Sequence, residues 1–141
     1  MITYQTEDTS FRFGSRRLIS RWIKEIVAHA ELKVGELSIV FCSDPYILAV
    51  NRQYLGHDYY TDIITFDYCE GSVLSGDLII SVDIVRANAE EYGAASFEEE
   101  LHRVIIHGVL HLIGFDDHTP KDRAEMRRQE NAALALLKTL A

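Results

Sequence analysis

The segment between Ser96 and Gly114 constrains the fold more than any other part of the sequence. Ser96 and Glu99 form a capping-box pattern at its start, and Gly114 is a typical stop signal, so the segment predicts one helix. The C-terminal half of this helix is apolar nearly all the way round, except for two histidines. A helix with no polar face packs inside a domain. We therefore expect a domain in which other elements surround this helix.

Signals for strands and for further helices flank this segment on both sides. Period-two and apolar runs predict strands over residues 2–5, 36–42, 62–67 and 77–82, with breaks at Gly35 and over 71–76. Helical spacing and start signals predict helices over residues 15–30, 44–54, 83–92 and 119–137, with Asp44 as one N-cap. The order β-α-β-α-β-β-α-α-α predicts a single α/β (α+β) domain over residues 1–141. We expect a mixed four-stranded sheet packed with about five helices.

Composition and charge exclude several classes of protein. No apolar run approaches the roughly 20 residues that span a bilayer, and the N-terminus lacks the features of a secretory signal, so we expect a cytoplasmic protein without a membrane partner. The net charge of −8 argues against broad non-specific nucleic-acid binding, but it does not exclude a local basic groove. Cys42 and Cys69 are interpreted as free, buried or half-buried thiols without a catalytic role.

The two histidines of the apolar helix form a candidate metal site. His107 and His111 are four residues apart, so both imidazoles lie on one side of the helix and can bind the same ion. Gly114 then allows a sharp turn into Asp116, Asp117 and His118. In the zincin pattern HExxHxxGxxH the third ligand follows the first by ten residues, and Asp117 occupies that position here. We therefore predict a zincin-like helix with Asp117 as the third ligand and His118 as the alternative.

A site with two histidines and one aspartate leaves a fourth coordination position open, which is typical of catalytic rather than structural zinc. We expect one Zn²⁺ ion, no organic cofactor, and catalysis by His107, His111 and Asp117 through the metal. Gly108 occupies the position where zincin proteases carry the glutamate base, which argues against a peptidase. Asp62 and His57, in the loop before a predicted strand, are the candidates for the missing acid or base, with turn capping as the alternative role.

Three motifs together resemble the YbeY endoribonucleases of bacterial ribosome maturation. The segment HGVLHLIGFD (107–116) is similar to the family's HGxLHLxGxDH. The segment NRQYLGHDYYTDIITF (51–66) is similar to NxxYRxxDxPTDVLSFP, and GDLIIS (76–81) is similar to GDIxIS. The resemblance covers about residues 35–135. The chain departs from the pattern at Leu55, where the family has an arginine, and at Asp117, where most members have histidine.

The resemblance implies a compact α/β domain with one zinc ion held by His107, His111 and Asp117. The implied activity is single-strand-specific RNA cleavage in 16S rRNA 3′-end maturation and ribosome quality control. The implied partners are a ribosomal RNA precursor and the small ribosomal subunit. Two alternatives stay open at this point. One is a zincin-like metallopeptidase, and the other is a non-catalytic ribosome-assembly factor with structural zinc.

Overall fold

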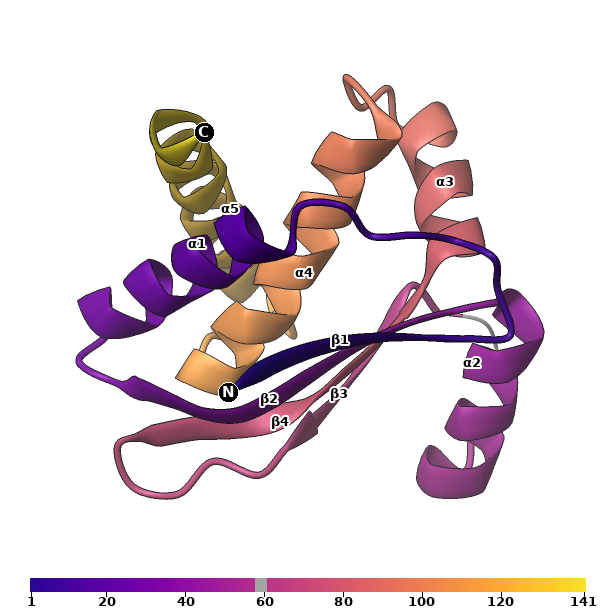
Figure 1. Ribbon diagram of the computed structural model, residues 1–141, viewed down its shortest axis with the longest axis horizontal. Coiled ribbons are helices and arrows are strands. Elements are labelled where there is room, and N and C mark those ends of the chain that lie inside the picture. Colours follow the sequence, from indigo (N-terminus) through magenta and orange to yellow (C-terminus); the bar gives the residue numbers. More distant parts are fainter. Residues whose placement is uncertain (58–60) are drawn as a thin grey trace.

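In a computed structural model, which describes residues 1–57 and 61–141, the chain forms one mixed sheet with helices on both of its faces (Figure 1). The strands are β1 (Ile2–Glu7), β2 (Lys33–Cys42), β3 (Ile63–Asp67) and β4 (Val73–Ser81). The helices are α1 (Arg16–His29), α2 (Asp44–Val50), α3 (Val82–Glu91), α4 (Phe97–Ile113) and α5 (Pro120–Leu140), and a π-helical turn, η1 (Asn51–Leu55), continues α2. The predicted order of elements and the predicted fold class are confirmed.

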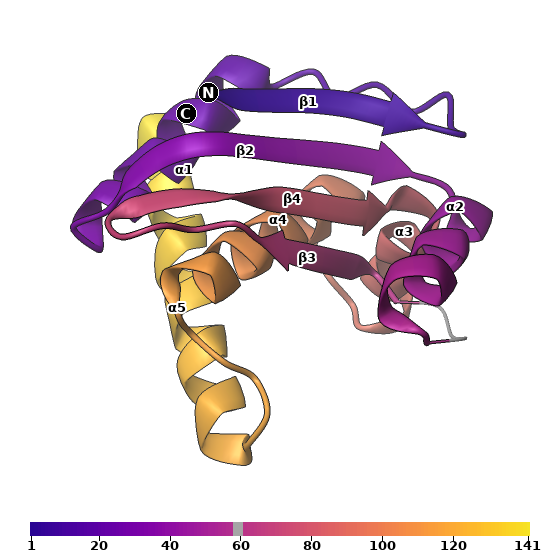
Figure 2. The same ribbon diagram turned by 90° about the horizontal axis from the view of Figure 1, so that it is seen from below.

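The sheet has the strand order β1-β2-β4-β3. The first three strands in this order run parallel to one another (Figure 2). The last strand, β3, forms one edge of the sheet and pairs antiparallel with β4. The two strands are also neighbours along the chain, with residues 68–72 between them. Asp62 directly precedes this edge strand.

Residues that alternate along the strands fill two separate cores. Ile39, Phe41, Leu78 and Ile80 face the larger core, which they share with α1, α3, α4 and α5. Their neighbours Val40, Cys42 and Ile79 face a smaller core against α2. This alternation is the period of a strand whose two faces are both covered.

Helix α4 lies in the middle of the larger core, as its apolar sequence predicts. It approaches β3 and β4 closely because glycines stand at the contacts. A Cβ at Gly108 would lie 2.8 Å from the terminal carbons of Ile63 and Leu78, and one at Gly76 would lie 3.1 Å from the methyl groups of Leu112. Position 108 therefore faces the sheet.

Several local predictions were wrong. The N-cap of α2 is Ser43, whose hydroxyl accepts the N–H of Tyr46, and Asp44 is the first helical residue. Gly35 does not break the chain but lies inside β2, where the pairing with β4 changes register. Gly76 likewise lies within β4 rather than in a turn. In these strands a glycine marks a close approach of neighbouring groups, and the sequence pattern alone does not distinguish this from a turn.

The interpretation of Cys42 and Cys69 as free thiols agrees with the structure. Cys42 is buried and Cys69 is half-buried, and both are free; burial raises the pKa of the Cys42 thiol to about 12. Thr119 and Asp122 form a reciprocal capping box at the start of α5. Across residues 1–57 and 61–141, no helix is both long and apolar enough to cross a bilayer.

Candidate metal centre

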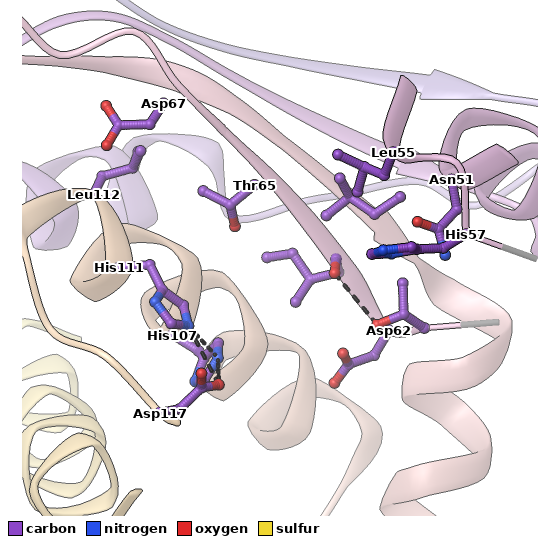
Figure 3. Close-up of a pocket in the computed structure, with 13 residues that line it drawn as sticks. Asn51, Leu55, His57, Asp62, Thr65, Asp67, His107, His111, Leu112 and Asp117 are labelled. Atoms are coloured by element: carbon purple, nitrogen blue, oxygen red, sulfur yellow. Dashed lines mark hydrogen bonds and ion pairs between the residues drawn. The ribbon is translucent and has the colours of Figure 1, made fainter. Parts of the chain in front are cut away.

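Three side chains converge at the C-terminal end of α4. His107 and His111 project from one side of the helix, and Asp117 returns toward them from the turn that follows Gly114 (Figure 3). Gly114 has a φ of 127°, a conformation that favours glycine, and it redirects the chain at this point. His107 Nε2 and His111 Nε2 are 3.1 Å apart, and each lies 3.4 Å from Asp117 Oδ2.

The size of this triangle fits one metal ion. Three donor atoms that each lie about 2.0–2.1 Å from a tetrahedral ion are about 3.3–3.4 Å from one another. The three measured distances are 3.1, 3.4 and 3.4 Å. Among the described residues, these three form the one cluster of His, Cys, Asp or Glu side chains with metal-binding geometry. Two imidazoles and a carboxylate therefore form one face of a possible four-coordinate site.

The alternative third ligand, His118, lies away from this triangle. Its side chain is 80% exposed, and its Nε2 lies 4.0 Å from Asp116 Oδ1. Its backbone carbonyl accepts a hydrogen bond from Arg123. The turn thus brings Asp117 to the two histidines and leaves His118 in solvent.

Glu130 is a residue of this site that the sequence analysis missed. Its side chain is buried on α5, and its Oε2 lies 2.7 Å from His107 Nδ1. Arg103 on α4 donates a hydrogen bond of 3.0 Å to Glu130 Oε1. When His107 Nδ1 carries its proton toward Glu130, His107 Nε2 is left as the acceptor that faces the triangle. A carboxylate in this position orients a metal-binding histidine and raises its basicity.

The electrostatics of this pair follow from burial and mutual contact. Burial by itself lowers the pKa of His107, but the hydrogen bond and negative charge of Glu130 outweigh it, so the net pKa is raised. Burial by itself raises the pKa of Glu130, but its hydrogen bonds to His107 and Arg103 hold the net pKa below its ordinary value. The pair therefore favours an ionised Glu130. A metal ion that binds at Nε2 has to compete with a proton on His107.

A signal for Glu130 exists in the sequence. Met126, Glu130, Ala133 and Leu137 are spaced four, three and four residues apart, and all four are buried on one face of α5. A charged residue in an otherwise apolar helical stripe requires a buried partner. The identity of that partner, however, depends on how α5 packs against α4.

The triad opens into a pocket of about 470 Å³. Asp62 and His57, the two candidates for acid or base, line this pocket together with His107, His111 and Asp117. In Figure 3 the Asp62 side chain lies on the triad side of His57. The Ser81 N–H donates to the Asp62 carbonyl and extends the β3–β4 pairing to this residue. Burial raises the pKa of the Asp62 carboxyl, and the positive charge of His107 only partly opposes this shift.

The other residues of the motif at 51–66 do not share one position in the structure. Leu55 lines the pocket and is 43% exposed, at the end of η1. Tyr54 is exposed and packs its ring edge against Phe66. His57 follows Gly56, the left-handed residue that ends η1. Asp58, Tyr59 and Tyr60 lie outside the described residues.

The family described as endoribonuclease YbeY matches residues 1–138. This chain belongs to the YbeY family. It is 56% identical over 135 residues to endoribonuclease YbeY of Bacteroides thetaiotaomicron, which covers 96% of this chain and 98% of the relative. It is 49% identical to endoribonuclease YbeY of Porphyromonas gingivalis strain W83, which covers 97% of this chain and 90% of the relative.

A solved structure supports the fold of this YbeY member. The solution structure of TM1509 from Thermotoga maritima is 30% identical in sequence and superimposes with a TM-score of 0.69. The comparison covers 97% of this chain and 89% of that chain. The resemblance found in three motifs over residues 35–135 therefore extends to nearly the whole sequence.

We expect the substitution Glu130→Gln to weaken metal binding at the triad. Glutamine keeps the shape of the side chain, and its amide oxygen still accepts a hydrogen bond, but the negative charge that raises the basicity of His107 is lost. Loss of such a partner typically lowers metal affinity by about 10- to 100-fold. The measurement is zinc affinity by competition with a chromogenic chelator, with Glu125→Gln on an exposed part of α5 as the matched control. Unchanged zinc affinity in Glu130→Gln would show that Glu130 has no influence on the site.

Proposed function

We propose that this protein is a zinc-dependent, single-strand-specific endoribonuclease that acts in 16S rRNA 3′-end maturation and ribosome quality control. Hydrolytic RNA cleavage follows from its membership of the YbeY family. The observation that carries the zinc part of the proposal is the triangle of His107, His111 and Asp117. The finer parts of the proposal are the metal, the ribosomal substrate, the small-subunit partner and a cytoplasmic location.

The donor set supports zinc over other common metal ions. Two imidazole nitrogens and one carboxylate oxygen are a frequent set for catalytic zinc, whereas magnesium and calcium prefer oxygen ligands alone. His107, His111 and Asp117 would hold the ion as three protein ligands at the wall of the 470 Å³ pocket, from which solvent and substrate would reach it. When bound here, zinc would supply Lewis acidity toward a phosphoryl oxygen and toward a water molecule.

The protein's own residues orient a metal ligand and transfer protons. Glu130 accepts the Nδ1 proton of His107 and so holds this ligand in one tautomer. Asp62, whose pKa burial raises, takes the proton from the attacking oxygen, because a raised pKa makes a carboxylate a stronger base. His57, which lines the same pocket, returns a proton to the leaving oxygen in this proposal. The family-based prediction of RNA rather than peptide cleavage agrees with Gly108, which lacks the glutamate base of zincin proteases and packs closely against Ile63 and Leu78.

The test of this proposal is metal removal and reconstitution. We expect chelator-treated protein to lose cleavage of a labelled single-stranded RNA and to recover it with one equivalent of zinc per chain. The same RNA in a duplex, DNA of the same sequence and an unstructured peptide serve as comparison substrates. Metal content is measured by mass spectrometry, and circular dichroism checks that the stripped protein remains folded.

The other outcomes identify the rival functions. Zinc-dependent cleavage of the peptide, with RNA left intact, would favour a zincin-like metallopeptidase. Loss of fold on metal removal, with no nuclease activity in the zinc-loaded protein, would favour an assembly factor with structural zinc. Co-sedimentation with purified small-subunit precursors, followed by mapping of the 3′ end of their 16S rRNA, tests the ribosomal part of the proposal.

A further inference from the structure

A second pocket adjoins the first on the other side of the triad. It has a volume of about 290 Å³ and lies among α3, α4 and α5. The two pockets share Asp62, His107 and Asp117, so they meet at the candidate metal position. A strand that crosses the metal position therefore has space to continue on both sides.

Among the described residues that line the two pockets, lysine and arginine occur in the second pocket alone. Of the described residues that line the first pocket, none is a lysine or an arginine. The second pocket is lined by Arg103, Arg123 and Arg127. Phosphodiester groups that flank a cleavage site carry one negative charge each, and arginine binds them with paired N–H donors. The charge distribution thus favours the second pocket as the place where flanking phosphates bind.

Two of these arginines are available for a ligand. Arg103 is engaged in hydrogen bonds with Glu130 and Asn131. Arg127 is 63% exposed, and its guanidinium lies 3.8 Å from Glu130. Arg123 donates one hydrogen bond to a backbone carbonyl, and a guanidinium has five N–H donors in all. Arg123 and Arg127 are four residues apart on α5, so their side chains leave the helix on the same side.

An exposed aromatic ring lies at the same pocket. Tyr92, the C-cap residue of α3, is 73% exposed and lines the pocket with the arginines. A tyrosine this exposed contributes little to the core. Aromatic faces beside a positively charged groove are the usual means by which proteins bind the bases of single strands.

Four acidic side chains also line this pocket, Asp62, Glu100, Asp117 and Glu130, and Asp62 and Asp117 lie where it meets the first pocket. Asp117 belongs to the triad, and Glu130 is paired with Arg103 and His107. Glu100 also lines the pocket, where it lies within the electrostatic influence of Arg103 and Arg127. Its negative charge opposes the binding of a phosphate in this pocket, so removal of this charge should strengthen RNA binding.

We propose that the pocket among α3, α4 and α5 is an RNA subsite, in which Arg123 and Arg127 bind phosphates next to the cleaved bond and Tyr92 stacks on an unpaired base. This inference rests on the proposed RNA cleavage and adds the side of the metal position on which the strand is held. The substrate it fits is a single strand, because a base paired in a duplex has no free face for Tyr92.

The test measures binding of a fluorescein-labelled single-stranded oligoribonucleotide with 2′-O-methyl groups, whose intactness is checked after each titration. We expect Arg123→Ala and Arg127→Ala each to raise Kd about 3- to 10-fold, and to lower the slope of log K against log salt by about 0.7 for each lost contact. Tyr92→Ala should raise Kd about tenfold. Glu100→Gln should lower Kd, because it removes a charge that repels phosphate.

Two matched variants provide the controls. Arg128 is on the same helix, is 72% exposed and pairs with Glu125, and it does not line the pocket, so Arg128→Ala should leave Kd and the salt slope nearly unchanged. Tyr68 is 58% exposed and does not line the pocket, so Tyr68→Ala is the control for Tyr92→Ala. Zinc content is measured for every variant to exclude metal loss as the cause.

Each result decides for or against the inference. If the wild-type protein binds RNA and the Arg123→Ala/Arg127→Ala double variant binds it equally well, the subsite is wrong while the nuclease proposal stands. If Arg128→Ala weakens binding as much as Arg127→Ala does, the effect is general surface charge and the subsite is also wrong. If the wild-type protein neither binds nor cuts single-stranded RNA, both the subsite and the proposed function fail.

Discussion

Replacement of Asp117 by alanine is expected to remove the metal site, whereas replacement of the adjacent His118 should leave it intact. Asp117 Oδ2 lies 3.4 Å from the Nε2 atoms of both His107 and His111, so it is the one oxygen of the triangle. His118 is 80% exposed and lies outside the triangle. We expect zinc affinity to fall more than about 100-fold in Asp117→Ala, which exceeds the loss typical when only a hydrogen-bond partner of a metal ligand is removed. RNA cleavage should fall to the level of the metal-free protein.

The comparison with His118→Ala separates ligand loss from damage to the turn. Both residues lie in the segment between Gly114 and α5, so a general disturbance of this turn would affect both variants alike. Asp117→His is the conservative variant, because imidazole is also a zinc ligand, and it should retain metal binding. Full zinc affinity in Asp117→Ala, together with a loss in His118→Ala, would reverse the assignment of the third ligand.

Replacement of Asp62 by asparagine is expected to lower kcat for RNA cleavage by about 10²- to 10⁴-fold while zinc content stays unchanged. Asparagine has nearly the same size but accepts no proton at neutral pH. Asp62 lines the pocket beside the triad without being one of its three members, so metal binding does not require it. Asp116→Asn is the control, since Asp116 is exposed and close in sequence to the triad but does not line the pocket.

The pH dependence gives a second measurement on the same variant. Burial raises the pKa of Asp62, and only its ionised form accepts a proton. The rate of the wild-type protein should therefore fall as the pH is lowered through this raised pKa, at a higher pH than for an ordinary aspartate near 3.9. Asp62→Asn should lack this acidic limb. If Asp62→Asn keeps full activity and His57→Ala loses it, the base is His57 instead.

The fold class and the histidine helix were predictable because they depend on short-range patterns. Helix α4 was delimited by Ser96 and Gly114, and its burial followed from an apolar surface with no polar stripe. The family was identified from three motifs whose order and spacing are visible in the chain, and the comparisons confirm it. The N-cap of α2 was predicted wrongly because the adjacent residues Ser43 and Asp44 are both good N-caps. The role of Gly35 was predicted wrongly because its close neighbours lie on β4, which is distant in sequence.

The sequence by itself determined that two imidazoles lie one helical turn apart in a buried helix, followed by a glycine turn rich in possible ligands. This information is local, because helix geometry converts a spacing of four residues into a common side. Only the tertiary structure decided that Asp117 rather than His118 turns toward the histidines, because that direction depends on the backbone at Gly114 and on the start of α5. It also decided that Glu130 contacts His107 and that Arg123 and Arg127 of α5 line a pocket beside the site. Residues 103, 107, 123, 127 and 130 meet there because α4 and α5 pack together, and no spacing along the chain specifies that contact.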